Sequence, residues 1–126
     1  MLRQRRVLIV DDEGNLASIV AQAFEHEGFK VATATNGIEC MNKVSGFRPD
    51  VIVMDIMMPR LDGVDTTRLI RRHEDFRSTL IIALSAKNDD RTRSDMMSAG
   101  ADVFLAKPFS MGQLILTVKN RLLASS

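Results

Sequence analysis

Five polar side chains directly follow short apolar runs of the sequence, where they could form one chemical site. Asp11 and Asp12 follow the first run, and Asp55 follows the third. Ser85 follows the fourth run, and Lys107 follows the fifth. Three carboxylates close to one another cannot all stay ionised without a countercharge. The set therefore predicts a cation site, provided that the fold brings the ends of the runs together.

The chemistry that these side chains favour is phosphoryl transfer. Mg²⁺ is the expected cation, because it binds carboxylate oxygens and tolerates a partial protein cage that waters complete. Lys107 would add a positive charge and Ser85 a hydroxyl, so an incoming phosphoryl group would meet a metal, an ammonium and a hydrogen-bond donor. One carboxylate could act as the nucleophile. Asp55 is the best candidate, because it stands alone after its run, whereas Asp11 and Asp12 resemble metal ligands.

The apolar runs that precede these residues predict β-strands. They are four or five residues long and rich in β-branched residues, which favours strands over helices. The first, third and fourth are apolar at every position, as expected for strands covered on both faces. The second and fifth are weaker and suit the edges of a sheet. The predicted strands span residues 7–10, 31–34, 51–54, 80–84 and 103–106.

Segments with helical periodicity lie between the runs. Apolar residues from Leu16 to Phe24 recur at the spacing of one helical face, and Asn36 is placed to cap a second helix. Ser110 to Gln113 reads as a capping box that opens a final helix. Further helices are expected at about 62–73 and about 88–98 from their place in the alternation. Three glycines are predicted to end helices in a left-handed conformation, at Gly28, Gly46 and Gly100.

Alternating strands and helices predict an α/β fold with a parallel sheet and helices on both of its faces. The carboxyl ends of parallel strands meet at one edge of the sheet, which is where open α/β sheets bind ligands. If the first and third strands are neighbours, Asp11, Asp12 and Asp55 share one pocket.

At these residues the sequence closely resembles the receiver domain of two-component response regulators. The resemblance covers essentially the whole chain and implies a single receiver domain over residues 1–126. It also implies a flavodoxin-like fold, a doubly wound five-stranded parallel sheet in the order 2-1-3-4-5 with five helices. The segments that carry the resemblance are residues 7–13, 35–37, 49–59, 62–63, 84–86, 100–102 and 107–109.

The resemblance implies a role for each acid. Asp55 would be the phosphoacceptor, which takes a phosphoryl group from the phosphohistidine of a histidine kinase. Asp12 and Asp55 would bind Mg²⁺ directly, together with the backbone carbonyl of Met57. Asp11 would act on the metal largely through water.

The resemblance also implies roles for the other polar residues and for one aromatic residue. Ser85 would donate a hydrogen bond to a phosphoryl oxygen, and Lys107 would pair with the phosphoryl group. The peptide bond between Lys107 and Pro108 would be cis, which would orient the lysine. Phe104 lies three residues before Lys107, where the family carries its switch aromatic. Phe104 lacks the hydroxyl of the tyrosine often found there, so packing alone would stabilise an inward rotamer.

The function expected from this resemblance is a phosphorylation-dependent signalling switch rather than an enzyme. A histidine kinase or a phosphotransfer protein would supply the phosphoryl group. Phosphorylation of Asp55 would draw Ser85 toward the phosphoryl group and let Phe104 move inward. The face formed by the fourth helix, the fifth strand and the fifth helix would then control an output domain or a partner protein, and a homodimer could form.

Three other functions fit these residues less well than the signalling switch. A phosphatase with an aspartyl nucleophile would carry a second acid two residues after the nucleophile, where this chain has Met57. A flavodoxin is disfavoured by the acidic rim and by the absence of Trp, Tyr and a glycine-rich phosphate loop. A receiver-like module that never uses phosphate is disfavoured by the complete set of acids, hydroxyl and lysine.

The composition sets limits on the remaining possibilities. The 126 residues carry 17 Lys and Arg against 16 Asp and Glu, and this balance argues against direct binding of nucleic acid or a membrane. Single Cys40 and the lack of a signal peptide or a long apolar run predict a cytoplasmic protein. The sequence leaves open whether the chain is a stand-alone regulator or a receiver cut from a longer protein. The arginines of the third helix are expected to form a solvated face, at Arg68, Arg71 and Arg72.

Overall fold

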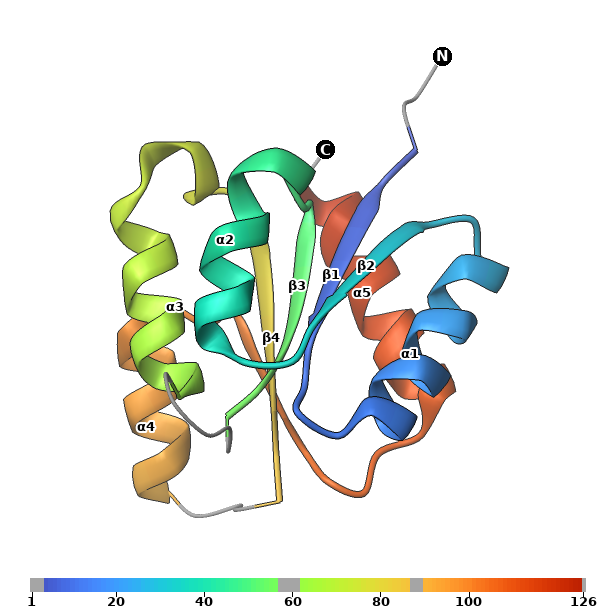
Figure 1. Cartoon of the computed structure of the whole chain (residues 1–126). Helices are drawn as coiled ribbons and strands as arrows, with labels where there is room; N and C mark the ends of the chain where they lie inside the picture. The colour runs from blue at the N-terminus through green and yellow to red at the C-terminus, as the bar shows by residue number, and fades with distance from the viewer. Residues whose placement is uncertain (1–3, 57–61, 87–89, 126) are drawn as a thin grey trace.

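A computed structural model of the chain describes residues 4–56, 62–86 and 90–125. Within these ranges, five parallel strands form one sheet in the order β2-β1-β3-β4-β5 (Figure 1). The order and the parallel pairing confirm the predicted doubly wound, flavodoxin-like fold, and each strand lies within one residue of its predicted bounds. The strands are β1 Arg6–Val10, β2 Lys30–Ala34, β3 Val51–Asp55, β4 Leu80–Ser85 and β5 Val103–Ala106.

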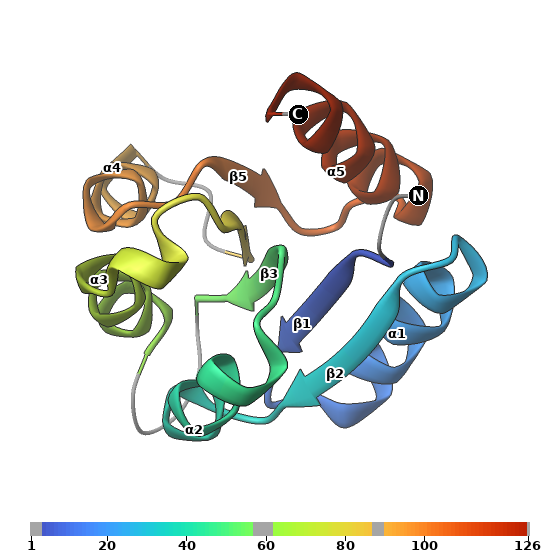
Figure 2. The same cartoon turned by 90° about the horizontal axis from the view of Figure 1, so that it is seen from above.

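Helices cover both faces of the sheet, as the alternating pattern predicts. Helices α1 and α5 lie on one face, and α2, α3 and α4 lie on the other (Figure 2). In the part of the chain that the structure describes, no helix is long and apolar enough to cross a membrane. The helices are α1 Gly14–His26, α2 Gly37–Phe47, α3 Gly63–Arg72, α4 Asp90–Ala99 and α5 Met111–Ser125, with a short 3₁₀ helix, η1, at Glu74–Phe76.

Each face of the sheet has its own apolar core, because successive side chains of a strand point to opposite faces. In β1, Val7 and Ile9 belong to the core under α1 and α5, and Leu8 and Val10 belong to the core under α2, α3 and α4. Every residue of β3 and β4 is buried, whereas β2 and β5 are partly exposed, which confirms them as edge strands. Cys40 lies in the second core, where burial raises the pKa of its thiol to about 12.

Two of the three predicted glycine helix ends are confirmed, and the third is wrong. Gly28 and Gly100 have φ angles of 92° and 119°. Helix α2, however, continues through Gly46 and ends at Phe47, and Arg48 takes the left-handed conformation with φ 53°. The next residue, Pro49, disfavours the α conformation for the residue before it, so the helix ends at the proline rather than at the glycine.

The predicted solvated face of α3 is correct for two arginines and wrong for the third. Arg68 and Arg72 are exposed, and Arg68 pairs with Asp65 at 3.0 Å. The side chain of Arg71 is only 16% exposed. Helical periodicity could not place Arg71 inside, because its partners come from segments that follow it in the chain.

Arg71 connects α3 to the start of β4 and to the turn before β5. Its guanidinium donates hydrogen bonds to the carbonyl oxygens of Gly100 at 2.8 Å and Thr79 at 2.7 Å. It also binds the Asp102 carboxylate at 2.8 Å, which in turn accepts the backbone N–H of Ile81 at 2.9 Å. One side chain thus holds together three segments that meet at the amino-terminal edge of β4.

We expect Arg71→Leu to lower the free energy of unfolding by about 2–3 kcal/mol, because it leaves carbonyl groups and the Asp102 carboxylate without their partner. Urea denaturation followed by circular dichroism measures the loss. Arg72→Leu, at the exposed neighbouring position, is the matched control and should change stability by less than about 0.5 kcal/mol. Equal effects of the two substitutions would show that the Arg71 contacts do not stabilise the fold.

Candidate functional site

The three predicted acids converge at the carboxyl edge of the sheet. Strands β1 and β3 are neighbours in register, with Val10 opposite Met54, so Asp11 and Asp55 follow at the same level. One carboxylate oxygen from each of Asp11, Asp12 and Asp55 lies within 4.8 Å of the other two. Asp11 and Asp55 are 4% and 6% exposed, whereas Asp12 is exposed to solvent. The acids therefore form a cluster with a buried base and an open side.

Backbone hydrogen bonds that extend the sheet past the strand ends fix the positions of these acids. The Asp11 N–H donates to the carbonyl of Ala34 at 3.0 Å, and the Ile56 N–H donates to the carbonyl of Leu84 at 3.0 Å. The Asp11 side chain also accepts the Glu13 N–H at 2.8 Å, which orients one of its oxygens just before α1 begins.

Lys107 reaches the acids from the end of β5. Its backbone N–H donates to the Ser85 carbonyl at 2.8 Å and continues the pairing of β4 with β5. Its Nζ lies 3.4 Å from the Asp55 carboxylate and 3.9 Å from the Asp11 carboxylate. The predicted cis peptide bond to Pro108 is present. The structure thus brings the lysine to the two buried acids, as the sequence predicts.

The charges of this cluster suit a divalent cation. Three carboxylates face one ammonium, and a doubly charged ion would neutralise the remainder. Oxygen ligands of one Mg²⁺ lie at most about 4.2 Å apart, since each is about 2.1 Å from the ion. The observed spread of up to 4.8 Å needs only a small contraction or a bridging water to meet that limit. The Met57 carbonyl, the fourth predicted ligand, lies outside the described residues.

The two remaining predicted residues lie on the strands next to the cluster. Ser85, the last residue of β4, is fully buried. Phe104 of β5 is only 8% exposed and belongs to the same apolar core as Ala83 and Met96. The Phe104 ring is therefore already inward in this structure.

Arg93 of α4 contacts Phe104, and the sequence does not indicate this contact. Its guanidinium carbon lies 4.7 Å from the centroid of the Phe104 ring. The sequence predicts helix α4 more from its place in the alternation than from its thin apolar stripe, so the pattern does not show which of its residues approach β5.

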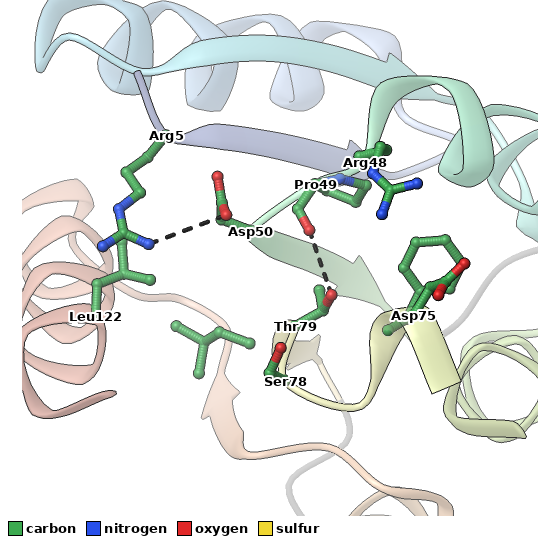
Figure 3. A pocket seen from close by; sticks show the side chains of 10 residues that line it. Arg5, Arg48, Pro49, Asp50, Asp75, Ser78, Thr79 and Leu122 are labelled. Atoms are coloured by element: carbon green, nitrogen blue, oxygen red, sulfur yellow. Dashed lines mark hydrogen bonds and ion pairs between the residues drawn. The ribbon is translucent and has the colours of Figure 1, made fainter. Parts of the chain in front are cut away.

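A cavity of about 320 Å³ lies at the opposite edge of the sheet, between the starts of β3 and β4 (Figure 3). Arg5 and Asp50 face each other across it at 4.0 Å, and Thr79 donates a hydrogen bond to the Pro49 carbonyl at 3.3 Å. None of its lining residues belongs to the predicted set. The acids and Lys107 thus occupy a different end of the molecule from this cavity.

Comparison with known proteins identifies relatives across nearly the whole chain. The family model of the response regulator receiver domain matches residues 7–119. The chain is 37% identical to the transcriptional regulatory protein TrcR of Mycobacterium tuberculosis over 121 residues, which are 96% of this chain and 46% of that protein. It is 37% identical to the transcriptional regulatory protein PrrA of Mycobacterium bovis over 90% of this chain and 48% of that protein. The chain thus spans about half the length of these curated relatives.

Solved structures agree with this result. The receiver domain of the Francisella response regulator 1452 superposes with a TM-score of 0.89 at 31% identity, over 98% of this chain and all of that chain (100%). The chemotaxis protein CheY4 of Vibrio cholerae superposes with a TM-score of 0.89 at 28% identity, over 94% of this chain and 98% of that chain.

Gly63 lies so close to the end of β3 that a side chain would displace the acid cluster. A Cβ at this position would be 2.7 Å from Cα of Ile56 and 2.9 Å from the carbonyl oxygen of Asp55. We expect Gly63→Ala to lower the free energy of unfolding by about 1–3 kcal/mol, as overpacking does, and to shift the backbone resonances around Asp55. Denaturation and NMR measure the two effects.

The matched control is Gly112→Ala in α5, where a Cβ meets nothing within 4 Å. Alanine there should leave stability unchanged or raise it by up to about 1 kcal/mol through helix propensity. A Gly63→Ala protein as stable as this control would contradict the close approach of α3 to β3.

Proposed function

The chain belongs to the family of response regulator receiver domains, and from this premise we propose that it is a phosphorylation-dependent switch of two-component signalling with Asp55 as the phosphoacceptor. The observation that carries the proposal is the position of the Asp55 carboxylate. It is nearly buried, lies within 4.8 Å of two further acids, and is 3.4 Å from Lys107. We further propose that residues 1–126 form one receiver domain.

In the proposed reaction, an Asp55 carboxylate oxygen attacks the phosphorus of a phosphohistidine. A new P–O bond forms, the P–N bond breaks, and its electron pair stays on the imidazole nitrogen of the donor. The Lys107 ammonium already holds the attacking carboxylate and would pair with a phosphoryl oxygen after transfer. The Ser85 hydroxyl, at the end of the adjacent strand, would donate a hydrogen bond to a second phosphoryl oxygen.

The acid cluster fits a magnesium ion as the resident cofactor. Asp11, Asp12 and Asp55 would hold it, with Asp11 acting largely through water and with the Met57 carbonyl as a further ligand. When bound, Mg²⁺ would supply positive charge to the phosphoryl oxygens during transfer. Because Asp12 is exposed while Asp11 and Asp55 are buried, the open side of the cluster lets both an ion and a phosphodonor enter.

The partners follow from this role. A histidine kinase or a phosphotransfer protein would donate the phosphoryl group as one step of a phosphorelay. The transfer would take place in the cytoplasm. The output would be carried by the face of α4, β5 and α5, which adjoins Ser85, Phe104 and Lys107, and would act on an output domain, a partner protein or a second copy. The chain would promote its own phosphorylation and dephosphorylation while serving as a signalling module. The phosphatase alternative gains no support from the relatives, which are response regulators.

We expect the protein to gain one phosphoryl group, about 80 Da, when it is incubated with Mg²⁺ and acetyl phosphate, because the Asp55 carboxylate, the proposed nucleophile, lies beside Lys107. Intact-protein mass spectrometry detects the gain. Asp55→Asn removes the nucleophile while keeping its shape and should gain nothing. Asp95→Asn, an exposed acid of α4, is the control and should behave as wild type. Equal labelling of the Asp55→Asn protein would disprove the assignment of Asp55.

We also expect Asp12→Asn to weaken Mg²⁺ binding at least about tenfold, because it removes one of the charges that the ion neutralises. Titration with MgCl₂ followed by amide NMR shifts measures the affinity without any phosphodonor. Asp65→Asn is the control, because Asp65 is an exposed acid of α3 that pairs with Arg68 and does not belong to the acid cluster. An unchanged affinity in the Asp12→Asn protein would exclude Asp12 as a ligand.

A further inference from the structure

The Phe104 ring lies between an apolar core and a cation. One side of the residue belongs to the core that also contains Ala83 and Met96, and the Arg93 guanidinium stands 4.7 Å from the ring centroid. Arg93 itself is exposed, so the cation reaches the ring from a residue at the surface of the molecule. A guanidinium within about 6 Å of an aromatic centroid is attracted by the negative face of the ring. The inward ring is thus contacted from both the core and helix α4.

From this geometry we propose that Arg93 is a positioning residue that holds the Phe104 ring inward and thereby ties α4 to the phosphoryl-binding edge of the sheet. The effect of the ring position on phosphorylation rests on the proposed function. The contact between Arg93 and Phe104 is itself a property of the unphosphorylated chain. A phenylalanine has no hydroxyl with which a partner could hold its tip. A cation over its face is therefore the polar interaction available to this ring.

Strand register connects the ring to the reactive residues. Phe104 pairs with Ala83, and two residues later Ala106 pairs with Ser85. Residues two apart in a strand lie on the same face, so Phe104 and Ser85 share one face of the sheet. Lys107 follows directly and binds the Asp55 carboxylate. A shift of α4 that removes Arg93 from the ring would therefore change the packing beside Ser85.

The expected size of the effect follows from the strength of such contacts at exposed sites, which corresponds to about a two- to fivefold change in an equilibrium constant. If the inward ring is the conformer that accepts the phosphoryl group, Arg93 raises the ratio of inward to outward rings by this factor. By linkage, phosphorylation would strengthen the contact between Arg93 and Phe104 by the same factor.

A double-mutant cycle on the unphosphorylated protein tests the contact. Arg93→Met keeps an unbranched side chain of similar reach but removes the cation, and Phe104→Leu removes the ring. We expect Arg93→Met to lower the folding equilibrium constant about two- to fivefold in the Phe104 protein and to have no effect in the Phe104→Leu protein. Arg93→Lys keeps a cation and should restore part of the loss. The same loss in both backgrounds would overturn the proposal.

The position of the ring gives a readout that a general loss of stability would not change. Ring resonances of Phe104, identified by comparison with Phe104→Leu, should become more accessible to a soluble paramagnetic probe in Arg93→Met. Arg91→Met, an exposed arginine two residues earlier on the same helix, is the matched control and should leave the ring protected. A ring that stays protected in Arg93→Met would overturn the proposal.

A kinetic measurement links the contact to the proposed function. The initial rate of phosphorylation by acetyl phosphate should fall by up to about fivefold in Arg93→Met. It should stay unchanged in Arg91→Met, and it should not fall further when Arg93→Met is added to Phe104→Leu. If no protein is phosphorylated but the double-mutant cycle shows coupling, the proposed function fails and the contact stands. If phosphorylation proceeds normally in Arg93→Met, the positioning role fails while the proposed function stands.

Discussion

Repulsion among three carboxylates at one edge of the sheet is the constraint on which the rest of the structure depends. Asp11, Asp12 and Asp55 come from two segments that are far apart in the chain, and the pairing of β1 with β3 forces them to one level. Two of the three are almost fully buried, where charges are costly unless they are compensated. Lys107 compensates for one charge only, so the site is built to take up positive charge from outside. The strand order thus produces a cluster of acids whose remaining negative charge a divalent ion would neutralise.

Holding such a cluster in place requires a rigid support, which the two apolar cores provide. Strands β3 and β4 are buried along their whole length, so they cannot shift to relieve the repulsion. The close approach of Gly63 to Ile56 and to the Asp55 carbonyl removes room for β3 to bend away. At the other end of the sheet, Arg71 joins α3 to the segments before β4 and β5. The charged edge is therefore fixed by contacts that themselves carry no part of the chemistry.

The local hydrophobic pattern predicted the strands. The rule that parallel strands end at one edge predicted the meeting of Asp11, Asp12, Asp55 and Lys107. The strand order itself followed only from the resemblance to receiver domains, because no local pattern determines which strands are neighbours. The sequence could not predict the place of Arg71, whose five N–H donors find partners only after distant segments have packed. It misplaced the end of α2 at Gly46, because the proline two residues after Phe47 outweighs the glycine signal. For the same reason as with Arg71, the sequence could not predict the contact of Arg93 with Phe104. The contact joins two elements, α4 and β5, whose relative position is defined only in the packed fold.

The near balance of 17 basic and 16 acidic residues conceals a local excess of negative charge at one edge of the sheet. Beside the cavity where strands begin, Arg5 and Arg48 stand together with Asp50 and Asp75, so both signs of charge are present. Where the strands end, three clustered acids face one lysine. In a fold of alternating strands and helices, each helix begins at the edge where the preceding strand ends, and helix amino termini carry partial positive charge. Asp11 already accepts the Glu13 N–H just before α1 begins. The topology that brings the acids together thus also places helix amino termini, with their partial positive charge, at the same edge of the sheet.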